Sequence, residues 1–193
     1  MARTKDFDED EVLKKAMYLF WSKGYNGTSM QDLVDSLGIS RSSLYDTYTD
    51  KHTLYIKSLE HYKKAAGAGM AAAMGNSGSA KETIRGLLEY FVNELTKDPE
   101  HKGCFLVNSA VELASHDQEI NQMLCEGDRQ TEALLREVIE KGQKTGEIDN
   151  KQDAAPIARF IFNNIKGMRV TARSGVDSKA FDEVVALTLS VLG

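Results

Sequence analysis

Residues 40–54, SRSSLYDTYTDKHTL, place one arginine and three serines directly before a Leu-Tyr pair and end in Asp-Lys-His-Thr-Leu. An arginine side chain can donate two hydrogen bonds to guanine O6 and N7, and hydroxyl groups can bond base edges or phosphates. On the outward face of one helix, these side chains would suit the major groove of DNA. Without a supporting scaffold, the same residues would be a solvated loop.

A scaffold is predicted from the residues on either side of this stretch. Apolar residues recur at helical spacing over residues 8–23, and Gly24 is placed to end that helix. A second helix is expected to begin at Thr28 and to stop at Gly38, and Ser40 is the N-cap of a third. Two short helices joined by a tight glycine turn form a helix-turn-helix.

Helix signals continue through the rest of the 193 residues, and the chain contains only two prolines. We expect an all-α fold of about nine helices, with no convincing strand. The domain organisation that follows is a helix-turn-helix domain over residues 1–50 and a larger helical domain over residues 51–193.

Composition limits the other functions that the chain could have. The net charge of −5 and the pI near 5.4 do not indicate nucleic-acid binding, but such binding needs only a local basic surface. Two cysteines are too few for a disulfide framework or a zinc finger, and the histidines lack metal-ligand spacing. No secretion signal, membrane-length apolar run, phosphate loop or nucleophile elbow is present. We therefore expect a cytoplasmic protein that is not an enzyme and that holds no metal or cofactor.

Residues 11–57 resemble the N-terminal module of the tetracycline-repressor (TetR) family of bacterial transcriptional regulators. The matching segments are AMYLFWSKGYNGTSM, LVDSLGIS and SSLYDTYTDKHTLY. The resemblance implies a DNA-reading domain of three helices, a connecting fourth helix, and further helices that bind a ligand and a second subunit. The positions that it implies for contact with double-stranded operator DNA are Thr28, Arg41, Ser42, Ser43, Tyr45, Thr47, Tyr48 and Lys51.

The two C-terminal helices, residues 154–173 and 178–192, are apolar on most sides, which is typical of buried helices. The resemblance implies that they form a four-helix bundle across the two-fold axis of a homodimer, and the alternative is a purely internal core. A dimer would place two readers about one helical turn apart, as a palindromic operator requires. The expected interface residues are Phe160, Ile161, Ile165, Gly167, Met168, Val184, Leu187 and Val191.

Residues 80–144 lie between these regions and are the expected location of a ligand chamber. The resemblance implies that an unknown small molecule binds there, changes the connecting helix and releases the operator, so we expect a repressor, although activation stays open. The residues expected to line the chamber are Phe91, Leu95, Cys104, Phe105, Asn108, Val111, Glu112, Met123 and Phe162.

Two alternatives remain open at this point. Cys104 follows Glu-His-Lys-Gly at a helix start, where a lowered thiol pKa would suit a redox- or electrophile-sensing repressor, although a free cysteine is more often a buried apolar residue. The other alternative is a helical ligand-binding protein that has lost DNA binding. That alternative gains support if Arg41, Thr28 and Lys51 do not converge on one face.

Overall fold

The computed structural model describes residues 7–75, 78–175 and 177–193, so residues 1–6 of the predicted first domain lie outside it. Within these ranges the all-α prediction is confirmed, because the chain forms nine α-helices, one short 3₁₀-helix and no strand. The helices are α1 (Glu9–Lys23), α2 (Met30–Leu37), α3 (Arg41–Tyr48), α4 (Lys51–Met74), α5 (Ala80–Thr96), α6 (Phe105–Leu113), α7 (Gln118–Thr145), α8 (Ala154–Thr171), η1 (Ala172–Ser174) and α9 (Ser178–Ser190).

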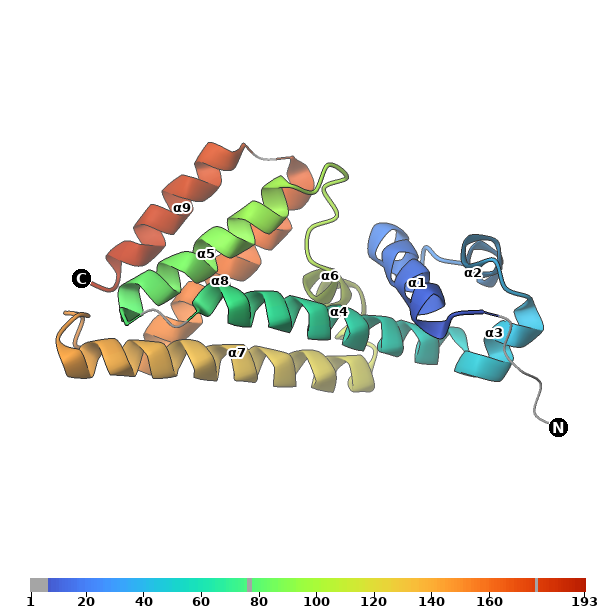
Figure 1. Cartoon of the computed structure of the whole chain (residues 1–193), viewed down its shortest axis with the longest axis horizontal. Coiled ribbons are helices and arrows are strands. Elements are labelled where there is room, and N and C mark those ends of the chain that lie inside the picture. Colours follow the sequence, from blue (N-terminus) through green and yellow to red (C-terminus); the bar gives the residue numbers. More distant parts are fainter. Residues whose placement is uncertain (1–6, 76–77, 176) are drawn as a thin grey trace.

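Helices α1 to α3 form a small group at one end of the elongated molecule, which we call the reading module (Figure 1). Asp8 caps α1 by accepting hydrogen bonds from the amides of Asp10 and Glu11. The second helix begins at Met30, two residues later than predicted. Its N-cap is Ser29, which forms a reciprocal capping box with Asp32 and thereby fixes the helix start.

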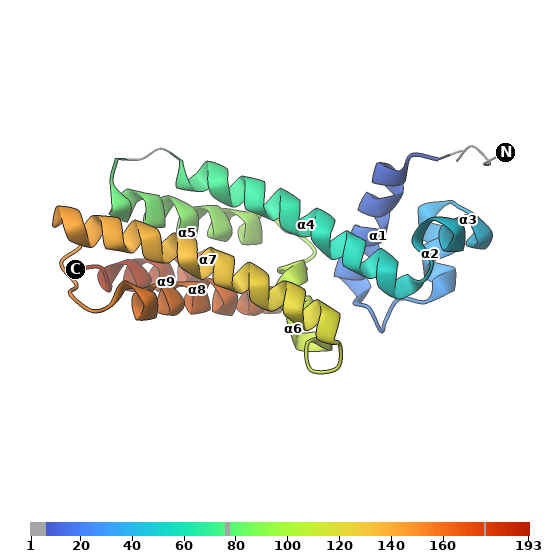
Figure 2. The same cartoon turned by 90° about the horizontal axis from the view of Figure 1, so that it is seen from below.

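Helix α4 runs from the reading module along the larger bundle, where it lies near α5 and α7 in both views (Figures 1 and 2). Asp50 caps it through the amide of Thr53, at 2.7 Å. Its first turns bury Leu54, Tyr55 and Leu59 in the same core as the reading module. One helix therefore belongs to both halves of the molecule.

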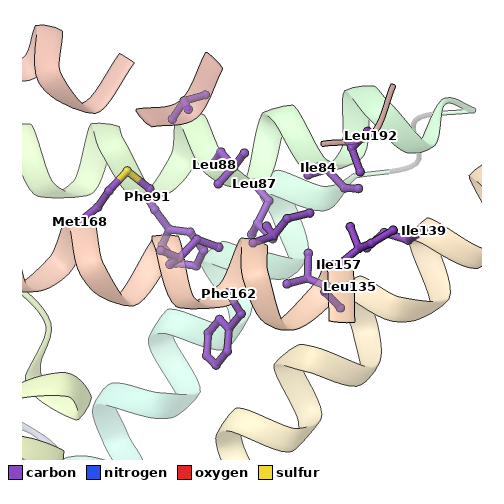
Figure 3. Packing of buried hydrophobic residues seen from close by; sticks show 14 of the residues in the cluster. Ile84, Leu87, Leu88, Phe91, Leu135, Ile139, Ile157, Phe162, Met168 and Leu192 are labelled. Atoms are coloured by element: carbon purple, nitrogen blue, oxygen red, sulfur yellow. The ribbon is translucent and has the colours of Figure 1, made fainter. Parts of the chain in front are cut away.

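Two apolar cores stabilise these halves. The first joins α1–α3 to the start of α4 and also includes residues of α6 and α7. The second lies among α5, α7, α8 and α9, where Ile84, Leu87 and Leu88 of α5 pack against the other helices (Figure 3). Each fully buried leucine or isoleucine stabilises the fold by roughly 1.5–3 kcal/mol. The division at residues 50 and 51 stays a prediction, because the first core extends beyond it.

Candidate DNA-reading surface and ligand chamber

The recognition helix α3 is held by one face and exposed on the other. Leu44 and Tyr48 are buried in the first core, whereas Arg41, Ser42 and Tyr45 are exposed. Ser40 caps the helix by accepting a hydrogen bond from the amide of Ser43 at 3.1 Å. The outward N-terminal face thus presents a guanidinium, a hydroxyl and a phenol, which are groups that can bond base edges or phosphates in a major groove.

Lys51 is the first residue of α4, the helix that follows α3. Its ammonium group lies 4.2 Å from the ring centroid of Tyr25. Partial burial lowers the pKa of Lys51, and the carboxylates of Glu112 and Asp32 oppose that shift. The helix N-terminus and this ammonium group together form an environment that favours a phosphate.

Two of the predicted DNA contacts are wrong for their side chains. Thr28 is fully buried, and its hydroxyl donates to the carbonyl of Gly24 at 2.7 Å. Tyr48 is buried as well, with its hydroxyl 3.3 Å from the carbonyl of Glu9. Because Thr28 is buried, it does not share an exposed face with Arg41 and Lys51, and this observation counts toward the alternative of lost DNA binding. The exposed surface is formed by α3 and the start of α4. Ser43 and Thr47 are half-buried at its edge.

Helix α6 binds the reading module through Glu112. The two carboxylate oxygens accept hydrogen bonds from the amides of Tyr25 and Asn26, at 3.0 and 2.7 Å. A Cβ atom at Gly24 would lie 2.8 Å from this carboxylate, and the φ of Gly24 is +78°, so glycine is required at that position. The prediction that Glu112 binds ligand is corrected, because its carboxylate is occupied by the α1–α2 turn.

Two further polar contacts join α4 to the segments around α6. The hydroxyls of Tyr55 and Ser109 lie 2.7 Å apart in a buried setting, and burial raises the pKa of Tyr55 well above its ordinary value. His52 Nε2 lies 2.7 Å from a carboxylate oxygen of Asp117. Burial raises the pKa of Asp117, but hydrogen bonds from the amide of Ile120 and from His52 outweigh it and hold the pKa below its ordinary value.

The hydrogen bonds that Asp117 accepts make part of the stability dependent on pH. Because the pKa of Asp117 is lower in the folded chain than the ordinary 3.8, its contribution is present above that value and is lost as pH falls through the folded pKa. We expect Asp117→Asn to lower the free energy of unfolding at neutral pH by up to about 1 kcal/mol. The difference from the unsubstituted protein should shrink between about pH 5 and pH 2 in urea titrations, and a constant difference would contradict this assignment.

A cavity of about 380 Å³ lies among α4, α5, α6, α7 and α8, and we call it the chamber. Four predicted ligand residues line it: Phe91, Val111, Met123 and Phe162. Figure 3 shows Phe162 extending from α8 away from the labelled residues of the core. The size is within the range of cavities that bind small molecules.

Four charged residues of the chamber were missed in the sequence: Lys63, Asp128, Lys166 and Arg169. Lys166 is ion-paired with Asp128 across α8 and α7. The guanidinium carbon of Arg169 lies 4.3 Å from the ring centroid of Phe91. In the sequence these residues resemble ordinary solvated charges on long helices, and only the packing of three helices brings them together.

The other predicted ligand residues lie outside the chamber. Leu95 and Cys104 line a second cavity of about 430 Å³ between α1, α4 and α5, which shares Phe91 and Arg169 with the chamber. Phe105 is corrected to a core residue, with its ring against those of Tyr55 and Tyr62. Asn108 donates its side-chain amide to the carbonyl of Lys102 at 2.8 Å. Cys104 is only 2% exposed, which favours a structural role over that of a reactive thiol.

Helices α8 and α9 together present an exposed apolar face. The side-chain amide of Asn164 in α8 donates a 3.0 Å hydrogen bond to the hydroxyl of Thr188 in α9. The exposed members of this face are Phe160, Gly167, Val184 and Leu187, and Val191 is half-buried beside them. The predicted interface residues Ile161, Ile165 and Met168 are buried inside the protomer instead, and this corrects the prediction. They lie on the face of α8 that meets the second core.

The fold and the exposed recognition helix define a helix-turn-helix, DNA-binding transcriptional regulator. Residues 12–57 match the family described as bacterial regulatory proteins, tetR family, and residues 80–187 match the tetracyclin repressor-like C-terminal domain. The chain belongs to the TetR family of transcriptional regulators. Among the residues that the structure describes, no helix is both long and apolar enough to cross a membrane.

Relatives cover the whole length of the chain. The HTH-type transcriptional regulator YezE of Bacillus subtilis is 34% identical over all of both chains. The HTH-type transcriptional repressor ComR of Escherichia coli is 31% identical over 97% of this chain and 90% of that protein. This membership favours a DNA-reading protein over a helical protein that has lost DNA binding.

Solved structures share the fold. A cysteine-substituted form of the TetR family regulator CifR, complexed with a 26-base-pair operator, superposes with a TM-score of 0.87 at 26% identity over all of both chains. A TetR regulator from Chloroflexus aurantiacus has a TM-score of 0.86 at 20% identity, over 94% of this chain and 91% of that one. The second likeness concerns the fold alone.

Proposed function

We propose that the chain acts in the cytoplasm as a homodimeric repressor that binds a palindromic operator and releases it when a small molecule occupies the chamber. The observation that carries the proposal is the surface of α3, where Arg41, Ser42 and Tyr45 are exposed while Leu44 and Tyr48 anchor the helix. Arg41 would read a base edge, and Ser42, Tyr45 and Lys51 would position the module on phosphates.

The dimer is supported by the exposed apolar face of α8 and α9. Leu187 is 75% exposed and Phe160 47% exposed on adjacent helices. Contiguous apolar residues of this kind mark interaction surfaces, and a two-fold axis would bring the same face of each protomer together. Gly167 would let the partner helices approach closely.

The release mechanism is supported by the position of α6 between the two halves. Leu106, Val107 and Val111 of α6 line the chamber, while Glu112 of the same helix holds the α1–α2 turn. A ligand that prefers a shifted α6 would therefore reposition the reading module. A preference of about 1–3 kcal/mol between the two states is enough for regulation.

The test is binding of the purified protein to the DNA beside its own gene, followed by fluorescence anisotropy at about 50 and 200 mM salt. We expect a specific complex that weakens with salt, and Arg41→Ala should lower its affinity by roughly ten- to a hundredfold. Loss of the bidentate guanidinium contact is the reason, because the variant keeps the buried face of α3 intact.

Lys64→Ala is the matched control. Lys64 is exposed on α4, so this substitution also removes one positive charge but at a position away from α3. It should bind the operator like the unsubstituted protein. A folded dimer that shows no preference for this DNA over an unrelated duplex, at either salt concentration, would overturn the proposal.

A further inference from the structure

The chamber carries more positive than negative charge. Lys63, Lys166 and Arg169 line it together with one carboxylate, that of Asp128. Asp128 is already paired with Lys166. In the part of the chain that the structure describes, Lys63 and Arg169 have no carboxylate partner, and Arg169 is held by the ring of Phe91 instead.

These cations share one side of the chamber. Phe162, Lys166 and Arg169 are spaced by four and three residues, so they lie on one face of α8. Lys63 reaches from α4 to α7, where its ammonium nitrogen would lie 3.6 Å from a Cβ atom at Gly127, next to Asp128. Lys63 and Lys166 therefore flank the same turn of α7, and Arg169 lies about one turn further along α8, against the ring of Phe91.

The remainder of the chamber is mostly apolar, and Gln130 and Thr131 are its uncharged polar side chains. Its apolar side chains come from α4, α5, α6, α7 and α8, and they are Met70, Phe91, Leu106, Val107, Val111, Met123, Leu124, Leu134 and Phe162. Lysine and arginine usually extend their charged ends into bulk water. Here three of them line an apolar cavity, which leaves positive charge that a bound anion would neutralise.

We infer that the chamber takes an amphipathic anion, a molecule with one carboxylate and an aliphatic or aromatic body. The carboxylate would accept hydrogen bonds from Lys63 and Arg169, and charge-assisted bonds of this kind are the strong ones. A neutral ligand would leave these cations without a counter-charge, and a cationic ligand would be repelled. This inference rests on the proposed function, because it names the ligand class of the proposed regulator.

The test is isothermal titration calorimetry of the DNA-free dimer with straight-chain carboxylates from hexanoate to dodecanoate, each paired with the alcohol of equal length. We expect at least one carboxylate to bind about tenfold more tightly than its alcohol. Lys63→Met should remove about that preference, because the substitution keeps the aliphatic stem and removes the charge. Lys64→Met, on an exposed neighbouring position, should bind both probes like the unsubstituted protein.

No preference for any carboxylate over its alcohol, or a preference that survives Lys63→Met and Arg169→Met alike, would overturn the inference. The calorimetry contains no DNA, so this failure is separate from failure of the proposed function. A carboxylate that binds as expected but leaves the specific DNA complex intact would confirm the ligand class and contradict the release mechanism. Release of the DNA at saturating carboxylate would support both.

Discussion

Leu187→Arg is expected to convert the dimer into monomers and to remove most of the affinity for the operator. Leu187 is the most exposed apolar residue of the α8–α9 face, and a buried unpaired guanidinium at its position would face its own copy across the two-fold axis. The dimer dissociation constant should rise at least about a hundredfold, which corresponds to about 2.7 kcal/mol. Sedimentation velocity measures this change directly.

The loss of operator affinity is expected because the dimer holds two reading modules together. In a dimer the second module binds its half-site as an intramolecular event, which typically raises affinity by about 10²–10⁴ over a single module. A monomeric variant loses this gain, so operator affinity should fall by about that factor although Arg41 is untouched. Anisotropy at protein concentrations below the new dissociation constant would show the loss.

Ala186→Arg is the matched control for this prediction. Ala186 is exposed and lies one residue earlier in α9. Unlike Leu187, it borders a groove between α9 and α5. The control should stay dimeric. A Leu187→Arg protein that sediments as a dimer would show that α8 and α9 do not form the interface.

Glu112→Gln is expected to loosen the reading module without unfolding the chamber. The carboxylate accepts two backbone amides of the α1–α2 turn, and hydrogen bonds to a charged group contribute about 1.5–3 kcal/mol each. The amide can replace one acceptor but not both, so the free energy of unfolding should fall by about 2 kcal/mol. Urea denaturation measures that loss.

The same substitution should leave a local signature. Amide hydrogen exchange at Tyr25 and Asn26 should accelerate, while exchange in α8 stays unchanged. Operator affinity should fall by about tenfold, because a less fixed module must be ordered on binding. Glu119→Gln removes an exposed acid at the start of α7 and is the control. If amide exchange at Tyr25 and Asn26 is unaltered in Glu112→Gln, the proposed role of Glu112 in holding the α1–α2 turn is wrong.

Much of the fold was predictable because local signals agree. Gly24 and Gly38 end helices as expected, with positive φ angles of 78° and 69°. Asp50 and Ser40 cap the helices that follow them. The exposed positions of Arg41, Ser42 and Tyr45 follow from the buried spacing of Leu44 and Tyr48.

The sequence misplaced positions where neighbouring helix caps compete or where contacts between distant helices decide. The second helix is expected to begin at Thr28, but its N-cap is Ser29, which forms a capping box with Asp32. Phe160 and Ile161 of α8 are both expected at the dimer face, yet Ile161 is buried in the core and Phe160 is exposed. No local pattern separates an apolar helix face that meets its own chain from one that meets a partner.

The contact between Gly24 and Glu112 makes the residues allowed at two positions, 88 residues apart, depend on each other. A relative with any side chain at the first position must shorten or move the acid at the second, because a Cβ atom there would lie 2.8 Å from the carboxylate. Changes at the two positions should therefore occur together among relatives, and a chain that lost both would need another way to hold its reading module against α6.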